Sequence, residues 1–325
     1  MGAVLDLAAL SEALRHDRGL AAKADISTVT ARLGLSGASA VAVGDDCAAI
    51  RDSDGYTLFA IEGFMNEFVV ADPWFAGWCG VMVNVSDVAA MGGTPLAVVD
   101  AIWSEGTGRA QEILAGMRAA AERFGVPIVG GHTNLKSNSD QLSVAILGHA
   151  KRLLTSFDAR PGDRLVAAVD LRGRYRPHFS NWEAATDAPA ARLRGDLSLL
   201  PTIADNGLSI AAKDISQGGI VGTAAMLAEC SQAGVCIDLR AIPLPAGVSL
   251  DRWLRTFPSF GYLLAVEPQN VEAVTRLFID RGVAAADIGG FNAGTRVAVT
   301  DGDGVEVIWD FSEHALLGCA ARVPA

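Results

Sequence analysis

The chain has 325 residues and a formal net charge of -11, with 26 Lys and Arg against 37 Asp and Glu. At roughly 100–200 residues per domain, this length indicates two domains more readily than one. Apolar residues make up 50% of the chain, which excludes wholesale disorder. The acidic balance argues against a nucleic-acid or anionic-membrane binder, because the footprint of such a protein is basic. We therefore expect no nucleic-acid partner.

Targeting and redox signals point to the cytoplasm. Every apolar stretch is interrupted well short of the roughly 18 residues that a membrane span requires. The first residues mix acidic and basic side chains and do not resemble a signal peptide. The five cysteines are odd in number and form no CxxC pair, so we expect neither a disulfide framework nor a zinc ribbon. These features predict a cytoplasmic protein with no membrane partner.

The first half of the chain mixes strands and helices. Short β-branched or apolar runs predict strands over Val41–Val43, Thr57–Ile61, Leu96–Ile102 and Leu142–Leu147. Apolar residues at helical spacing predict helices over Val81–Met91 and Arg109–Phe124, and Gly125 is a natural end for the second.

A turn signal, Pro161-Gly162-Asp163, separates this half from the next. We place the domain boundary there, with domains 1–155 and 156–325. The second half repeats the mixture, with predicted helices over Ile220–Cys230 and Val271–Ile279 and predicted strands over Leu165–Val169, Tyr262–Val266, Arg296–Thr300 and Val305–Trp309. Asp301-Gly302-Asp303-Gly304 joins the last two strands as a hairpin. Hairpins among mixed elements favour an α+β fold.

Two segments of the first half carry candidate metal ligands. Asp45 and Asp46 follow Gly44, and they either form a turn with an Asx hydrogen bond or supply carboxylates to Mg²⁺. Asn84 and Asp87 are three residues apart on a predicted helix and share a face. They are either solvated surface residues or partners of a cation.

Two glycine pairs suggest places where a backbone approaches a ligand. Gly130 and Gly131 are predicted to form a turn after a strand, and such a turn lets the backbone approach a ligand closely. His132, Thr133 or Asn134 would then hydrogen-bond that ligand. Asp214 precedes Gly218-Gly219 at the start of a predicted helix, whose N–H groups favour anions. The structural alternative is that Asp214 or Ser216 caps that helix.

Together these segments resemble the PurM-like ATP-binding superfamily, which includes aminoimidazole ribonucleotide synthetase, thiamine monophosphate kinase and selenophosphate synthetase. Gly44–Ile50 resembles the GDDAAV motif, Asn84–Pro95 the helix with AMGG and Pro, Gly130–Thr133 the GGH-[ST] turn, and Asp214–Ile220 the D-[IV]-[ST]-x-GGL element. The resemblance implies a ferredoxin-like N-terminal half that dimerises into a β-barrel, a C-terminal α+β half, and a homodimer that binds ATP and Mg²⁺.

The resemblance also implies site roles. The metal ligands implied are Asp45, Asp46, Asp87 and Asp214. The nucleotide site would include Asp46, Glu62, Asn84, Gly130, Gly131, His132, Thr133, Asp214 and Gly218. Lys23, Asp45 and Asp87 would act in catalysis. The implied activity is that of an ATP-dependent phosphotransferase or a ligase or cyclase, which phosphorylates or phosphate-activates an unidentified small substrate.

The chain departs from the selenophosphate synthetases at three places. Lys23 is retained, but Leu20, Ala21 and Ala22 stand where the reactive cysteine or selenocysteine belongs, so no thiolate can form there. Glu62 replaces an Asp, and Thr256–Tyr262 replaces the DPQTSGG element. Two alternatives stay open: a selenide, water dikinase that lacks the usual Cys, and a non-catalytic ATP-binding accessory protein.

One basic segment bears on the substrate. Residues 151–194 hold nine of the 26 Lys and Arg, with Arg172, Arg174 and Arg176 alternating. Guanidinium groups pair well with phosphate or carboxylate, so the substrate is possibly anionic. The alternative is a solvated loop with scattered arginines.

Overall fold

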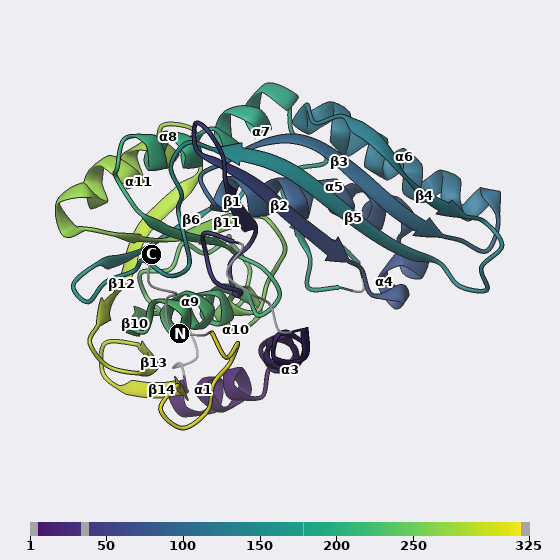
Figure 1. Ribbon diagram of the computed structural model, residues 1–325. Coiled ribbons are helices and arrows are strands. Elements are labelled where there is room, and N and C mark those ends of the chain that lie inside the picture. The colour runs from purple at the N-terminus through teal and green to yellow at the C-terminus, as the bar shows by residue number, and fades with distance from the viewer. Residues whose placement is uncertain (1–5, 34–38, 178, 320–325) are drawn as a thin grey trace. The chain divides into compact units, whose positions relative to one another are not determined.

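The computed structural model describes residues 6–33, 39–177 and 179–319 (Figure 1). The chain divides into two compact units. The five-stranded unit comprises Asp46–Arg152 and Thr186–Thr202, and the seven-stranded unit comprises Met1–Asp45, Leu153–Ala185 and Ile203–Ala325. The N-terminal segment and the second half of the chain thus share one unit, whereas the sequence division at residue 155 groups residues 1–45 with the first half.

The five-stranded unit is built on one mixed sheet. Its strands are β1 (Ala48–Arg51), β2 (Tyr56–Gly63), β3 (Thr94–Trp103), β4 (Ile128–Asn134) and β5 (Gln141–Ala150), in the spatial order β1-β2-β5-β3-β4. Only the β3–β4 pair is parallel. The order β2-α5-β3-α6-β4-β5 differs from the β-α-β-β-α-β order of a ferredoxin-like fold, so that part of the fold prediction is wrong.

Four helices accompany this sheet: α4 (Asn66–Ala71), α5 (Pro73–Ala90), α6 (Thr107–Phe124) and α7 (Ala190–Leu197). Helix α5 begins at Pro73, with the Asp72 side chain accepting from the Phe75 amide at 3.2 Å. It is buried along nearly its whole length. A Cβ on Gly77 would lie 1.9 Å from the Ile113 carbonyl oxygen, so α5 and α6 touch backbone to backbone. This contact holds α5 firmly.

The seven-stranded unit has a second mixed sheet. Its strands are β6 (Arg164–Val169), β9 (Ala211–Asp214), β10 (Gly234–Asp238), β11 (Gly261–Val266), β12 (Ala284–Asn292), β13 (Arg296–Thr300) and β14 (Val305–Asp310), in the order β14-β13-β10-β12-β6-β11-β9. A separate two-stranded sheet pairs β7 (Arg174–Tyr175) with β8 (Trp182–Glu183). Both units mix helices and strands, which confirms the α+β prediction.

The helices of this unit are α1 (Leu7–Arg15), α2 (Arg18–Lys23), α3 (Asp25–Leu33), α9 (Gly219–Ser231), α10 (Leu250–Leu254) and α11 (Val271–Ile279), with a 3₁₀ turn at Pro268–Asn270. Helix α8 (Leu199–Asp205) crosses the division between the units. Helix α9 is buried on all sides except at its last residue, as expected for a helix that is apolar all round.

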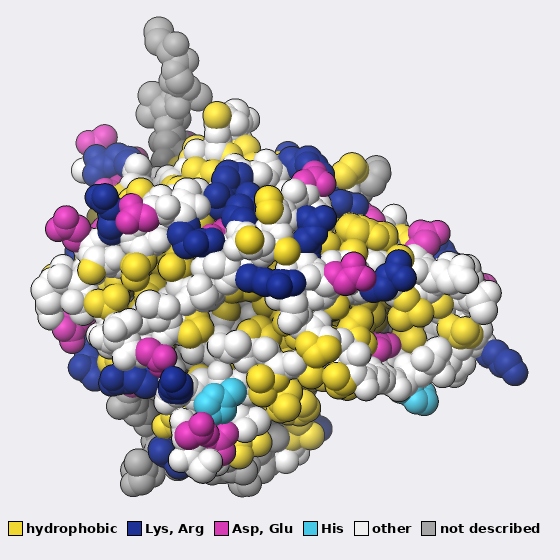
Figure 2. All heavy atoms as spheres, turned by 90° about the horizontal axis from the view of Figure 1, so that it is seen from above, with side chains coloured by type: hydrophobic (Ala, Val, Ile, Leu, Met, Phe, Trp, Pro, Cys, Tyr) yellow, Lys and Arg dark blue, Asp and Glu magenta, His cyan; other side chains and the backbone are white. Residues whose placement is uncertain are grey.

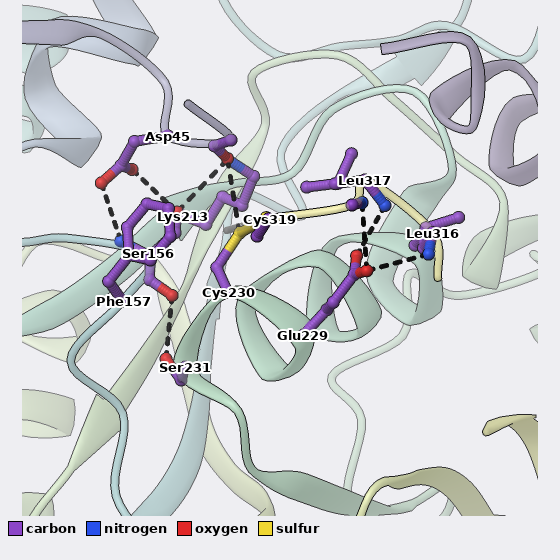
Figure 3. The surroundings of a disulfide bond; sticks show 12 residues. Asp45, Ser156, Phe157, Lys213, Glu229, Cys230, Ser231, Leu316, Leu317 and Cys319 are labelled. Atoms are coloured by element: carbon purple, nitrogen blue, oxygen red, sulfur yellow. Dashed lines mark hydrogen bonds between the residues drawn. A yellow bond between two sulfur atoms is a disulfide. The ribbon is translucent and has the colours of Figure 1, made fainter. Parts of the chain in front are cut away.

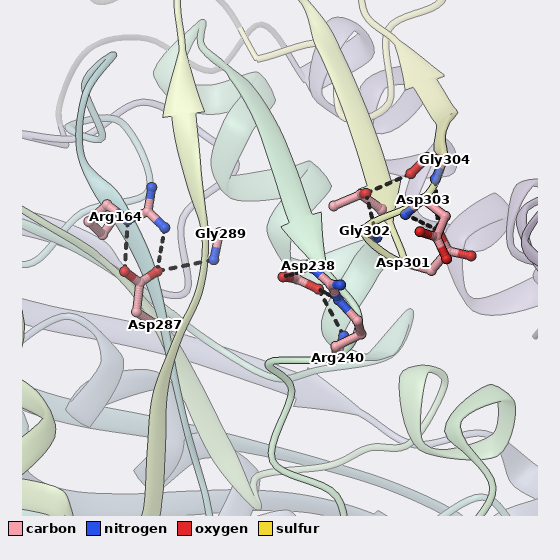
Figure 4. Close-up of polar contacts among 10 residues, drawn as sticks. Arg164, Asp238, Arg240, Asp287, Gly289, Asp301, Gly302, Asp303 and Gly304 are labelled. Atoms are coloured by element: carbon pink, nitrogen blue, oxygen red, sulfur yellow. Dashed lines mark hydrogen bonds and ion pairs between the residues drawn. The ribbon is translucent and has the colours of Figure 1, made fainter.

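Polar contacts fix the last hairpin and two inner strands of the larger sheet (Figure 4). Asp301 Oδ1 accepts from the amides of Asp303 and Gly304 at 3.0 and 2.9 Å, which closes the predicted β13–β14 hairpin. Arg164 on β6 donates two hydrogen bonds to Asp287 on β12, at 2.7 and 3.0 Å. Bidentate pairs of this kind fix geometry as well as adding energy.

Most predicted elements are confirmed, but two are wrong. The helix over Val271–Ile279 has the predicted bounds, and the helix ending at Phe124 stops at Gly125 in the left-handed region, with φ of 76°. The strand predicted over Val41–Val43 is absent: Val43 forms only an isolated bridge with Asp45, and β1 begins at Ala48. The turn predicted at Gly130–Thr133 is part of β4.

Two further sequence expectations can be compared with the structure. No helix within the described ranges is long and apolar enough to cross a membrane. Cys230 and Cys319 form a disulfide across a separation of 89 residues, which the expectation of no disulfide framework did not anticipate. An odd cysteine count argues against a framework of several bridges but cannot exclude a single one.

Candidate functional site

Asn84 and Asp87 lie one turn apart on α5 and are both buried. Asn84 Nδ2 donates to the carbonyl oxygens of Gly80 and Val144, at 2.8 and 3.0 Å. These two bonds fix the side-chain amide, and they leave Asn84 Oδ1 buried without a hydrogen-bond partner among the described residues. A buried acceptor without a donor is costly, so this oxygen is suited to a ligand or a cation.

Asp46 is brought to the same place. A carboxylate oxygen of Asp46 and one of Asp87 lie within 4.8 Å of each other. Two carboxylates at this separation repel each other, and Asp87 is only 5% exposed, so water screens the repulsion poorly. Carboxylate and amide oxygens are the hard donors that Mg²⁺ prefers. The residues present therefore fit a divalent cation.

A row of residues crosses the sheet at the level of this cluster. Glu62 on β2 pairs with Val144 on β5, which pairs with Asp100 on β3, which pairs with Gly131 on β4. Because paired residues of neighbouring strands share a face, Glu62 and Asp100 lie on the same face as Val144, whose side chain meets α5 at Gly80. The row sets two carboxylates on the face that carries α5.

Asp100 is a candidate that the sequence analysis did not select. Burial raises the pKa of its carboxyl above the ordinary value. Its neighbours Val98 and Ile102 are fully buried, so alternation along the strand could have placed Asp100 on the inner face.

The glycine pair lies in an exposed strand. Gly131 is on the face of Asp100, whereas Gly130 pairs with Val99 on the opposite face. His132 pairs with Ala101, and its ring lies 5.8 Å from that of Trp103. His132 and Thr133 thus point to opposite faces of β4 and do not share one turn.

In the seven-stranded unit, Asp45 anchors a turn (Figure 3). Its carboxylate accepts from the amide and the hydroxyl of Ser156, at 3.0 and 2.7 Å. Lys213 Nζ, on a side chain that is almost fully buried, donates to the Gly44 carbonyl oxygen at 3.3 Å and to Ser156 Oγ at 3.4 Å. Sequence reasoning gave Lys213 no role, although it directly precedes Asp214.

Asp214 ends β9 and is 1% exposed. Helix α9 begins beyond it with Gly218 as its N-cap and no side-chain cap bond, so neither Asp214 nor Ser216 caps the helix. The glycines there also serve packing. A Cβ on Gly219 would lie 2.1 Å from the Leu254 carbonyl oxygen.

Lys23 is the last residue of α2 and is half-buried. The helix is capped by Asp17, whose side chain accepts from the amides of Gly19 and Leu20. The residues that lead to Lys23 are therefore helical.

The alternating arginines are paired with acids. Arg172 contacts Asp170 at 2.7 Å, and Arg174 and Arg176 contact the buried carboxylate of Glu183 at 3.2 and 3.7 Å. These ion pairs favour a structural role for the stripe. Figure 2 shows basic side chains interspersed with acidic and hydrophobic ones on the face that it displays.

Acidic residues lie beside glycines in each of the two α+β units: Asp214 precedes Gly218 at the start of α9, and Asp100 lies against Gly131 on β4. The family model described as AIR synthase related protein, N-terminal domain, matches residues 44–150, and the corresponding C-terminal domain matches residues 160–302. An uncharacterized protein of Synechocystis is 47% identical over 310 residues, which cover 94% of this chain and 96% of that protein. The chain belongs to the AIR synthase related family.

More distant relatives have named activities. A selenide, water dikinase of Myxococcus xanthus is 28% identical over 253 residues, covering 72% of this chain and 71% of that protein. The solved structure of AaThiL complexed with AMPPCP and TMP superposes with a TM-score of 0.65 at 20% identity, covering 84% of this chain and 91% of that chain. The similarity to the AaThiL structure shows that the two proteins share a fold.

Proposed function

We propose that this protein is an ATP- and Mg²⁺-dependent enzyme that phosphorylates, or activates through phosphate, a small substrate. The observations that carry the proposal are the carboxylates of Asp46 and Asp87, which lie within 4.8 Å of each other, and the buried, unsatisfied Oδ1 of Asn84, one helical turn from Asp87. The relative named selenide, water dikinase supports it.

We assign roles as follows. Asp46 and Asp87 would hold Mg²⁺, and the family resemblance adds Asp214 to the same set. When bound, the ion would neutralise phosphate charge. Asn84 would position a ligand through Oδ1, while Glu62, Gly130, Gly131, His132, Thr133 and Gly218 would line the nucleotide site. Asp45 holds the turn that precedes Asp46, and Lys23 would stabilise charge on the transferred group.

A binding titration tests this proposal. We expect Mg²⁺-ATP to bind the wild-type protein, and Asp87→Asn to weaken binding by about tenfold or more. Asp54→Asn is the matched control, because the Asp54 side chain is 79% exposed on the β1–β2 loop and takes no part in the cluster. Equal affinities in all three proteins would refute the assignment.

Turnover separates an enzyme from an accessory protein. ADP release would be measured with panels of small carboxylates, phosphate esters and amines as acceptors. Release that depends on one acceptor and on Asp87 would establish catalysis. Tight ATP binding with no ADP formed under any of them would favour the accessory protein instead.

The structure weighs against the selenide alternative. Leu20, Ala21 and Ala22 stand in the region of the reactive residue, and Leu20 is 3% exposed and packs against Gly222 of α9. None of these three side chains offers a nucleophile. We therefore favour an oxygen acceptor over selenide.

We also propose that the protein is a homodimer, formed through the face of the five-stranded sheet opposite α5. Four neighbouring side chains on that face are large, apolar and 40–66% exposed: Phe59, Ile61, Val99 and Leu147. An apolar patch of this kind usually marks an interface. A second copy is the natural occupant, because a two-fold contact needs only one self-complementary surface.

Light scattering on Ile61→Lys tests the dimer. We expect wild type to have twice the mass of the chain and the variant to be monomeric. Ile279→Lys, which changes an exposed isoleucine on α11, should leave the mass unchanged. A wild-type monomer would refute the proposal.

A further inference from the structure

We propose that Cys230 and Cys319 form a reversible thiol–disulfide switch that controls how firmly the Gly44–Asp45 turn is held. The consequence for nucleotide binding rests on the proposed function, but the structural effect does not. Gly44, Asp45, Cys230 and Cys319 all belong to the seven-stranded unit. Cys230 lies in the last turn of α9, and Cys319 follows β14 in the C-terminal segment (Figure 3).

The C-terminal segment is also held by contacts that do not depend on the disulfide. Glu229, the neighbour of Cys230, accepts from the amides of Leu316, Leu317 and Gly318 at 2.9, 2.6 and 3.2 Å (Figure 3). Leu316 and Leu317 are also buried. After reduction these Glu229 hydrogen bonds would keep the two thiols close together, so the disulfide can re-form within one molecule. A pair that stays aligned in both states is suited to reversible oxidation.

The sulfur atoms lie directly against the turn. A Cβ on Gly44 would stand 2.7 Å from Cys319 Sγ and 2.9 Å from Cys230 Sγ. Cys230 Sγ is 3.9 Å from the Gly44 carbonyl oxygen, the same atom that accepts from Lys213 Nζ. The disulfide and Lys213 therefore both lie against the Gly44 carbonyl oxygen.

The Gly44–Asp45 turn directly precedes Asp46, a proposed metal ligand. Asp45 is fixed to Ser156, and Asp46 follows it directly in the chain. Loss of the cross-link would leave the C-terminal segment held by the Glu229 hydrogen bonds and by the burial of Leu316 and Leu317. We expect the Gly44–Asp46 backbone then to open more often, because a cross-link that restrains one side of the turn is gone.

The exchange reaction needs only a low-molecular-weight disulfide as oxidant. The partly exposed Cys319 attacks it as a thiolate, which releases one thiol and forms a mixed disulfide. Cys230 then attacks Cys319 Sγ and releases the second thiol. One external disulfide is reduced to two thiols, which take up the two protons that the cysteines lose, and one Cys230–Cys319 bond forms.

Cys236 on β10 provides a matched control. Its thiol lies outside the disulfide, and burial together with the nearby Asp238 charge raises the pKa of this thiol. It is thus a poor thiolate in the same unit.

Hydrogen exchange of the full chain, measured with and without reductant, tests the proposal. We expect reduction to speed exchange of the Gly44–Asp46 amides by about fivefold or more, while β3 is unchanged. Cys319→Ser should exchange at the fast rate in both conditions, and Cys236→Ser should behave as wild type. Equal exchange of oxidised and reduced wild type would overturn the switch, and this comparison needs no variant to fold.

A Mg²⁺-ATP titration of the same samples separates this proposal from the proposed function. We expect the reduced protein to bind about threefold or more weakly than the oxidised one. If neither state binds ATP but exchange at the turn differs, the proposed function fails and the switch stands. If both bind equally and exchange is the same, the switch fails and the function stands.

Discussion

The adjacent glycines of β4 provide a sharp test of the site geometry, because the structure gives them opposite surroundings. A Cβ on Gly131 would lie 2.3 Å from Asp100 Oδ1 and 2.6 Å from the Asp100 carbonyl oxygen. A Cβ on Gly130 would have nothing within 4 Å. Gly131→Ala and Gly130→Ala are therefore a matched pair that differ in what one methyl group meets.

The expected magnitude follows from these distances. Ordinary carbon contacts are about 3.5–4.0 Å, so the Gly131 methyl would overlap a main-chain oxygen by about 1 Å. Asp100 lies in the middle of β3, paired on both sides, and cannot retreat without disturbing β4 and β5. Overpacking of this kind costs about 1–3 kcal/mol. We expect Gly131→Ala to lower the free energy of unfolding by about 2 kcal/mol, and Gly130→Ala to leave it unchanged or raise it by about 0.5 kcal/mol.

Urea unfolding followed by tryptophan fluorescence measures both variants against wild type. The comparison uses the midpoint and the slope, because a two-unit chain can unfold in more than one step. Equal stability of the two variants would refute the placement of Asp100 beside Gly131. A Gly130→Ala protein that keeps its stability but loses Mg²⁺-ATP binding would show that a ligand uses the open side of β4.

Variants at three residues, Asp87, Asp310 and Glu229, test individual polar groups of the structure. Asp87→Asn should abolish the rise in Tm that Mg²⁺ gives the wild-type protein, while the metal-free Tm is equal or higher because the repulsion from Asp46 is removed; a Mg²⁺-induced rise equal to that of wild type would count against the site. Hydrogen bonds from Ser312, which has the largest effect, and from Arg296 and Thr295 lower the pKa of the Asp310 carboxyl. The ionised carboxylate therefore stabilises the folded protein above about pH 4, and this contribution is lost as the pH falls further. Asp310→Asn should therefore be less stable than wild type in urea at pH 6, and the difference should shrink below pH 4; a difference that grows there would contradict the sign. Glu229→Ala should cost about 3 kcal/mol, because two buried amides lose their acceptor, and Glu229→Gln less; chemical denaturation of both variants would show whether that order holds.

Local patterns predicted the helices well because a helix is defined by near neighbours. The spacing of Val271, Val274 and Phe278 gave the bounds of α11 without reference to the rest of the chain. The strands were harder. Gly130-Gly131 was interpreted as a turn from composition, but its partners on β3 lie about 30 residues earlier and make it a strand.

The candidate site divides in the same way. Asn84 and Asp87 could be paired from helical periodicity alone. The row from Glu62 to Asp100 depends on strand register, and the Cys230–Cys319 pair on a separation of 89 residues, and neither leaves a local signal.

Asn84 is the residue on which the orientation of the proposed site depends. Its amide nitrogen faces two carbonyl oxygens, at 2.8 and 3.0 Å, and this arrangement leaves Oδ1 for a ligand. Asn84→Asp keeps the shape but places a carboxylate oxygen where the nitrogen stood. Two hydrogen bonds of about 1 kcal/mol each are lost, and a buried charge faces two carbonyl dipoles.

We expect Asn84→Asp to lower the free energy of unfolding by about 3 kcal/mol at pH 7.5. Burial and the two carbonyl oxygens would raise the pKa of the new carboxyl above its unfolded value, so the protonated form is the stable one and the loss should diminish as the pH falls to 5. Urea unfolding at both pH values against wild type measures this change. A variant as stable as wild type at pH 7.5 would mean that the amide nitrogen does not face Gly80 and Val144, and the unsatisfied Oδ1 could then no longer support a ligand site on α5.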